Sequence, residues 1–125
     1  MNIFLIEDDL NRVARFKKYC SKMEYNLFHV DNVEDGKKLL DSQTHFDVLF
    51  FDHDLGGRVY VDSSDPNTGY QLALHIKEKG YSYEQVIIHS LNQVGAENIL
   101  SVMKECSEFS DIIPFTRLPE FINFF

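Results

Sequence analysis

Carboxylate and imidazole side chains follow directly after three apolar stretches of the sequence. They are Glu7 and Asp8 after the first stretch, Asp52, His53 and Asp54 after the second, and His89 after the third. A hard divalent ion such as Mg²⁺ prefers carboxylate oxygens, and several carboxylates at short range either raise a pKa or recruit a cation. The four carboxylates of this set are therefore candidate ligands of a divalent metal, with Mg²⁺ the first expectation.

The histidines of this set leave two options open. Successive residues of an extended chain point to opposite sides, so Asp54 should share the direction of Asp52 while His53 turns away. His53 is then a structural hydrogen-bonding residue or a participant, and His89 is a general acid or base or a satisfied core histidine. If both imidazoles reach the carboxylates, Mn²⁺ or Zn²⁺ suits the site as well as Mg²⁺. The candidate catalytic residues are Asp52, His53 and His89.

Short polar and basic residues near these positions are candidates for binding phosphate. Ser90 and Asn92 open a helix, where capping explains either one, although the same geometry aims free N–H groups at an anion. Arg12 lies one turn into the first helix and either reaches back to a phosphate or remains solvated. Arg58 and Tyr60 lie in a long loop, where they cover the pocket, select a base by stacking or simply belong to the loop.

Side chains this far apart in the sequence meet only if the ends of separate strands lie side by side. Apolar stretches predict strands over residues 3–6, 26–30, 48–51, 85–89 and 111–115. Apolar spacing predicts helices over residues 9–23, 33–42, 68–79, 95–106 and 118–125, the third capped by Thr68 and closed by Gly80. This alternation predicts a single α/β domain over residues 1–125 with a doubly wound parallel sheet. Ligands of such sheets bind beyond the carboxyl ends of the central strands.

Two stretches lie outside that alternation. The polar, glycine-containing connection over about residues 55–68 is longer than most strand-to-helix loops, and a small hairpin around residues 58–61 is expected in it. The C-terminus carries Phe121, Phe124 and Phe125, which need covering. They are expected to belong to the core or to a surface through which the protein forms a homo-oligomer.

Net charge, cysteine content and hydropathy limit the kinds of partner and location that are expected. The net charge of −8 argues against binding an extended nucleic-acid duplex, which needs a basic face, and favours a phosphate-containing small molecule or an RNA end. Cys20 and Cys106 are the only cysteines and lie far apart, so reduced thiols and a cytoplasmic location are expected. No stretch approaches the length of a membrane span, so no membrane partner is expected.

The predicted elements and polar residues are similar to the receiver domains of two-component signalling, which have a flavodoxin-like (βα)5 fold with strand order 2-1-3-4-5. Glu7 and Asp8 match their acidic pair, Asp52 matches their phosphate-accepting aspartate, and Ser90 their Ser or Thr after the fourth strand. Where receivers carry a phosphate-contacting Lys, the nearest residue is Arg117 in F-T-R-L-P. The long loop and the two extra histidines also depart from the signalling pattern.

A narrower resemblance accounts for those departures. The motifs are E-D-D-x-x-R at residues 7–12, L-F-F-D-H-D-L-G-G at 49–57, N-T-G-Y-Q at 67–71 and I-H-S-x-N-x-x-G at 88–95. Together they closely resemble the cyclic-phosphate-processing receiver-like family. This resemblance implies processing of cyclic phosphate ends in RNA repair or in phage and bacterial conflict systems.

The leading hypothesis is therefore a metal-dependent phosphoesterase that opens a cyclic phosphodiester. Glu7, Asp8 and Asp52 hold the cation in this hypothesis, and His89, helped by His53 or Asp54, moves protons. Two alternatives stay open. One is a signalling receiver phosphorylated on Asp52, and the other is a non-catalytic module that binds a nucleotide or a protein. Whether the protein is an enzyme is therefore open at this point.

Overall fold

Five parallel strands form one sheet. They are β1 (Asn2–Ile6), β2 (Asn26–Val30), β3 (Phe46–Phe51), β4 (Tyr83–Ile88) and β5 (Ser110–Ile112). The computed structural model describes residues 1–42, 45–123 and 125. The strand order is β2-β1-β3-β4-β5 and every neighbouring pair is parallel. The doubly wound, flavodoxin-like sheet predicted from the sequence is confirmed.

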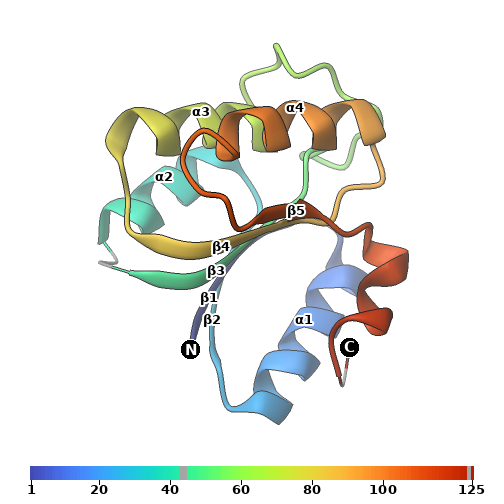
Figure 1. Cartoon of the computed structure of the whole chain (residues 1–125). Coiled ribbons are helices and arrows are strands. Elements are labelled where there is room, and N and C mark those ends of the chain that lie inside the picture. The colour runs from blue at the N-terminus through green and yellow to red at the C-terminus, as the bar shows by residue number, and fades with distance from the viewer. Residues whose placement is uncertain (43–44, 124) are drawn as a thin grey trace.

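Helices cover the two faces of the sheet unequally. Figure 1 shows α2 (Val33–Ser42), α3 (Gly69–Lys79) and α4 (Gln93–Met103) on one face and α1 (Leu10–Met23) on the other. The buried residues of α1 recur at three- and four-residue spacing, as the apolar pattern predicts. Thr68 caps α3, and Gly80 closes it in the left-handed conformation at φ 71°, both as predicted.

The central strand β3 fixes the edge where the candidate residues lie. Residues 48–51 of β3 are all buried, since core side chains pack on both of its faces. Ile6 of β1 is the register partner of Phe51, and Phe51 is the partner of Ile88 of β4. The residues that follow these three partners therefore leave the sheet at one common edge.

The predicted hairpin around residues 58–61 is wrong. Between β3 and α3 the chain forms turns and bends, with one isolated antiparallel bridge between Asp54 and Thr68. The N–H groups of Tyr60 and Val61 donate to the carboxylate of Asp54, at 2.6 and 3.2 Å, and not to a partner strand. The carboxylate of Asp54 thus binds the backbone N–H groups that a hairpin would pair with a second strand.

The predicted helix over residues 118–125 is also wrong. The chain forms a short 3₁₀ helix, η1 (Phe115–Glu120), with Pro119 inside it. Proline has no N–H to donate, so it cannot extend an α-helical hydrogen-bond ladder. Phe125 is buried against Phe16 and α1, whereas Phe121 is 59% exposed; Phe124 lies outside the described residues. Each described helix is too short or too polar to cross a membrane.

Candidate active site

Three buried polar side chains lie side by side at the carboxyl edge of the sheet. Glu7, Asp52 and His89 follow β1, β3 and β4, and each extends the backbone ladder by one hydrogen bond to the neighbouring strand. They are 0%, 3% and 0% exposed. Each offers one ligand atom, and these atoms lie within 4.8 Å of one another. The edge therefore carries a compact group of two carboxyls and an imidazole, which is able to hold a metal ion.

Glu7 is the most heavily bonded member of the group. Its Oε1 lies 3.0 Å from His89 Nε2, and its Oε2 accepts the N–H groups of Asp8 and Asp9 at 3.0 and 3.1 Å. Arg12 reaches back from the first turn of α1, with a guanidinium nitrogen 3.6 Å from Glu7 and 3.9 Å from Asp52. One cation thus faces both carboxyls, and the predicted contact of Arg12 with a phosphate stays a prediction.

Burial changes how these carboxyls titrate. The pKa of Asp52 is raised to about 7, mainly by desolvation and also by the neighbouring Glu7. Desolvation also raises the pKa of Glu7, against a hydrogen bond from Asp52 that lowers it. Two buried carboxyls that hydrogen-bond to each other share a proton. Around neutral pH this pair is therefore poised to release that proton to a base or to a cation that displaces it.

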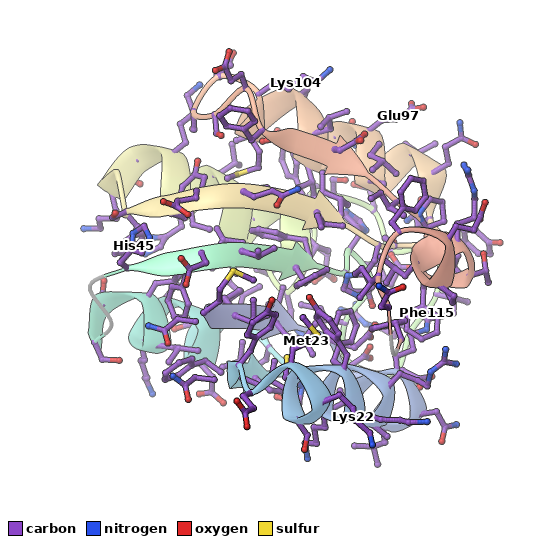
Figure 2. All side chains as sticks on the ribbon, turned by 60° about the horizontal axis from the view of Figure 1, so that its bottom comes forward. Lys22, Met23, His45, Glu97, Lys104 and Phe115 are labelled. Atoms are coloured by element: carbon purple, nitrogen blue, oxygen red, sulfur yellow. The ribbon has the colours of Figure 1, made fainter. Side chains whose placement is uncertain are left out.

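His89 is enclosed by aromatic rings on the α1 side of the sheet. Its ring centroid lies 5.2 Å from that of Phe16, and 6.4 Å from those of Phe50 and Phe115. Figure 2 places Phe115, the first residue of η1, beyond the carboxyl ends of the strands. Burial lowers the pKa of His89 to about 4, so the imidazole is neutral around neutral pH. Its Nδ1 has no hydrogen-bond partner among the described residues.

A cavity of about 290 Å³ opens next to this group. Its walls are Asp8, Asp9, Arg12, Asp52, Asp54, Gly57, Arg58 and Val59. Asp52 belongs to both the buried group and the cavity wall, whereas Glu7 and His89 are behind the wall. The N–H of Gly57 donates to Asp8 at 2.5 Å and so joins the long loop to the segment that follows β1. A ligand in the cavity therefore meets carboxylates and arginines and reaches His89 only through Asp52 and Glu7.

His53 is on the opposite side of the sheet edge, as strand alternation predicts. Its Nδ1 lies 2.8 Å from Asp54 and its Nε2 lies 2.8 Å from the hydroxyl of Ser63. The ring packs against Gly95 of α4, where a Cβ would lie only 2.4 Å from the imidazole. This contact explains the glycine in I-H-S-x-N-x-x-G. The geometry gives His53 a structural place, and a catalytic role for it stays a prediction.

Asp54 accepts hydrogen bonds from the loop backbone and from the N-cap of α4. Its Oδ1 accepts from Asn92 at 3.0 Å, in addition to the contact with His53 and the loop N–H groups described above. Partial burial acts to raise the pKa of Asp54, but the hydrogen bonds from Asn92 and His53 and from the loop backbone bring it below its usual value. An ionised Asp54 with both oxygens occupied suits loop positioning better than metal binding.

A family profile described as "Cyclic-phosphate processing Receiver domain" matches residues 1–105 of the chain. The chain belongs to this family. No curated protein matches the sequence.

Solved receivers share the fold of this cyclic-phosphate processing receiver domain. The signal receiver domain of a Luxo repressor protein from Vibrio parahaemolyticus is 18% identical, with a TM-score of 0.64 over 95% of this chain and 84% of that one. Response regulator TrrA from Thermotoga maritima, solved in complex with Mg²⁺-BeF, is 16% identical, with a TM-score of 0.64 over 95% and 93%. A CheY-like receiver from Methylobacillus flagellatus is 16% identical, with a TM-score of 0.59 over 96% and 93%. At these identities the likeness shows the fold alone.

Three predicted phosphate-binding residues lie away from the cavity of this receiver domain. Asn92 caps α4 by accepting from Gly95 N at 3.0 Å, and Ser90 accepts from Asn92 N at 3.1 Å. Arg117 is in η1, where it pairs with Glu120 at 3.0 Å and is 58% exposed. None of the three lines the 290 Å³ cavity. Helix capping accounts for Ser90 and Asn92, and phosphate contact by any of the three stays a prediction.

Sequence reasoning missed two residues of this edge. Ser63 binds His53 across the folded loop, and no local pattern marks a serine that finds its partner only after the loop closes. Asp9 caps α1 by accepting from Arg12 N at 3.0 Å, and it also lines the cavity. The run of three acids in E-D-D was the available signal for that second place.

The opposite edge of the sheet carries features that none of the family motifs contains. A larger open cavity of about 1070 Å³ lies there, beside Tyr83 and Phe109. His45, Asp47 and Glu84 also bring ligand atoms within 4.8 Å of one another, but these side chains are half-buried or exposed. Figure 2 shows His45 at the start of β3, away from the carboxyl ends. The buried group at the carboxyl edge is therefore the better candidate for chemistry.

Proposed function

We propose that this receiver domain is a metal-dependent phosphoesterase that opens a cyclic phosphate in a nucleotide or at an RNA end. One observation carries the proposal. Asp52 joins a buried carboxyl–imidazole group to a cavity with an arginine on its wall. Carboxylates beside a phosphate-sized cavity suit a divalent cation, and the extra imidazole is foreign to phosphoacceptor chemistry.

The donor set fits a divalent ion. Glu7, Asp8 and Asp52 would hold it, since two of them belong to the compact ligand group and two line the cavity. Their oxygens favour Mg²⁺, and the nitrogen of His89 within the same group leaves Mn²⁺ or Zn²⁺ open. When bound, the ion would supply charge neutralisation at the phosphate and a water of lowered pKa.

The chain's own residues supply binding and proton handling. Arg12 lines the cavity and is 25% exposed, so its guanidinium can donate charge-assisted hydrogen bonds to a phosphate. Asp52 faces the same space, and its raised pKa would let it hold or release a proton around neutral pH. His89 accepts or donates behind Glu7 at 3.0 Å and therefore acts as a positioning residue for the carboxyl pair. His89 thus supplies a buried base next to the carboxyl pair, which would support proton transfer at Asp52 during opening of the ring.

The test is turnover of a nucleoside 2′,3′-cyclic phosphate with Mg²⁺, Mn²⁺ or Zn²⁺, followed by ³¹P NMR. The wild type should open the ring in a metal-dependent way, and Asp52→Asn should slow it by about 10²-fold or more. Glu34→Gln, an exposed carboxylate on α2 that pairs with Lys37, is the matched control. Failure of the wild type to form product with any of the three metals would contradict the proposal.

The second candidate function is a phosphoacceptor receiver. It is favoured by the place of Asp52, which ends β3 and lines a cavity with Asp8. Burial and the shared proton oppose it, because a nucleophilic carboxylate must be ionised and accessible. Acetyl phosphate discriminates between the two. Only a phosphoacceptor gains one phosphoryl group in the intact mass, and only it loses that gain in Asp52→Asn.

A non-catalytic binder is the third reading of the same cavity. It predicts saturable binding of a nucleotide or a partner protein without product. The turnover experiment separates it from the phosphoesterase, and the acetyl phosphate experiment separates it from the phosphoacceptor.

A further inference from the structure

Tyr60 combines a strained backbone with an exposed aromatic ring. Its φ is 53°, and outside glycine only Glu24 shares a positive φ among the described residues. A bulky residue in the left-handed region costs free energy that the surrounding structure must offset. The side chain is 79% exposed, so burial of the ring returns nothing to the folded state. The strain therefore points to a role outside folding.

A buried network holds Tyr60 in place. Asp54 accepts from Tyr60 N at 2.6 Å and from Val61 N at 3.2 Å. Asp54 itself is fixed by His53 at 2.8 Å and Asn92 at 3.0 Å, and these two partners are 0% and 8% exposed. Solvent-excluded groups thus fix the backbone from which one exposed ring projects beside the candidate active site.

Tyr60 lines a second cavity that is similar in size to the first. The second cavity, of about 320 Å³, is lined by Tyr60, Val61, Asp62, Ser63, Asn92, Val94, Gly95 and Asn98. Asp54 lines the first cavity and bonds directly to Tyr60 and Asn92 of the second, so one side chain separates them. Figure 1 shows the loop lying over α4, where Ser63 accepts from Asn98 at 2.9 Å.

The two cavities differ in chemistry. The first has two arginines and four carboxylates on its wall, which suits a phosphate and a cation. The second has two amides, a serine hydroxyl, two valines and Tyr60, with Asp62 its single charged residue. A heterocyclic base needs a flat stacking partner and neutral hydrogen-bonding groups, and every base has a π-face that such a ring can cover.

We propose that Tyr60 is the base-stacking residue of this domain, so that a nucleotide places its cyclic phosphate in the first cavity and its base on Tyr60 in the second. The inference rests on the proposed function and names the residue by which the domain would distinguish nucleotides and RNA ends from cyclic phosphates without a base. The strained turn supports this role because it holds the backbone of Tyr60 at the wall of the second cavity.

The test compares two ligands that differ only in the base. They are adenosine 2′,3′-cyclic phosphate and methyl riboside 2′,3′-cyclic phosphate, and their Kd values are measured by calorimetry with a chelator present. The wild type should bind the adenosine ligand about 10-fold more tightly, the effect of one stacked base. Tyr60→Asn should bring the two Kd values together, because asparagine tolerates the left-handed backbone but offers no ring.

Two further variants keep the inference falsifiable. Tyr60→Phe keeps the ring and should keep the preference, whereas Phe109→Asn removes an exposed aromatic at the opposite edge and serves as the control. An equal Kd for both ligands in the wild type, or an unchanged preference in Tyr60→Asn, would overturn the inference. Turnover with Mg²⁺ is scored separately. A preference for the adenosine ligand without turnover would support the stacking role of Tyr60 and contradict the phosphoesterase. Turnover without that preference would support the phosphoesterase and contradict the stacking role.

Discussion

His53 and His89 occupy equivalent places on opposite sides of one sheet edge. Each follows a central strand and each is completely buried. Both ring nitrogens of His53 have partners, one in Asp54 and one in Ser63. His89 bonds to Glu7 through one nitrogen, while the other faces aromatic rings without a partner. Burial is the same for the two imidazoles, so it does not separate a structural histidine from a functional one.

The difference lies in what each histidine is bonded to. His53 completes a satisfied network that positions a loop, and such networks add rigidity. His89 joins two carboxyls that share a proton, so its environment costs folding energy and leaves a nitrogen unsatisfied. Unfavourable electrostatics that the fold maintains are typical of functional sites. The α1 side of the edge is therefore where we expect chemistry, and the α4 side is where we expect support for it.

The largest expected effect is on the α4 side. His53→Ala removes a buried ring and takes one hydrogen-bond partner from Asp54 and one from Ser63, so it should lower the free energy of unfolding by about 3–5 kcal/mol. Urea titration measures this. His75→Ala, a half-buried histidine on α3 whose Nε2 lies 3.1 Å from the Tyr81 hydroxyl, is the control and should cost far less. Equal losses in the two variants would remove the structural role assigned to His53.

The next effect belongs to Asp52 and depends on pH. With a chelator present, Asp52 keeps its proton in the folded state up to about pH 7, whereas the unfolded chain releases it near 3.8. Its stabilising contribution is therefore complete below pH 3.8 and is lost as the pH rises through 7. Relative to Asp52→Asn, the wild type should lose about 1.4 kcal/mol of stability per pH unit in this window. A pH-independent difference between the two proteins would refute the shared buried proton.

His89 should show the opposite pH dependence. Its pKa is about 4 in the folded state, against 6.5 in the unfolded chain, because burial disfavours the imidazolium. Its contribution is complete above pH 6.5 and is lost as the pH falls through 4. His89→Gln keeps an N–H donor for Glu7, so it should remove about 1.4 kcal/mol per pH unit of acid sensitivity over this shorter window. Urea titrations of the variant and the wild type between these pH values measure the free energy of unfolding. An equal dependence of that free energy on pH in the two proteins would contradict the prediction.

Much of this edge could be predicted from the sequence because its signals are local. Apolar stretches that end abruptly in acids or histidine indicate buried parallel strands, and the order of elements brings Glu7, Asp52 and His89 to one edge. The caps at Thr68 and Gly80 follow from residue type alone.

The remainder depended on contacts that are distant in sequence. Nothing local shows that Asp54 will bind the backbone at Tyr60 and so prevent a hairpin. Alternation correctly placed His53 away from Asp52, but its partner Ser63 lies across a loop whose path only the closed structure defines. At the C-terminus the aromatic spacing predicts a helix, but Pro119 lacks the N–H that an α-helix needs and the chain forms a 3₁₀ helix instead.

The smallest expected effect decides which side of the edge binds a cation. Mg²⁺ at about 100 times its Kd should raise the free energy of unfolding by about 2.7 kcal/mol, provided that it binds only the folded state. The gain should be larger at alkaline than at acid pH, since the ion must displace the proton that Glu7 and Asp52 share. Thermal unfolding with and without Mg²⁺ measures it, with no need for turnover.

Two variants turn that measurement into a test of the comparison. Asp52→Asn removes a ligand on the α1 side and should abolish the gain. His53→Gln alters only the α4 side and should keep it, because the loop network is not part of the metal-binding group. If His53→Gln lost the gain and Asp52→Asn kept it, the cation would bind through Asp54 and the loop. The assigned roles would then be reversed. The hydrogen-bonded network around His53 would be the functional one, and the buried imidazole of His89 would serve packing alone.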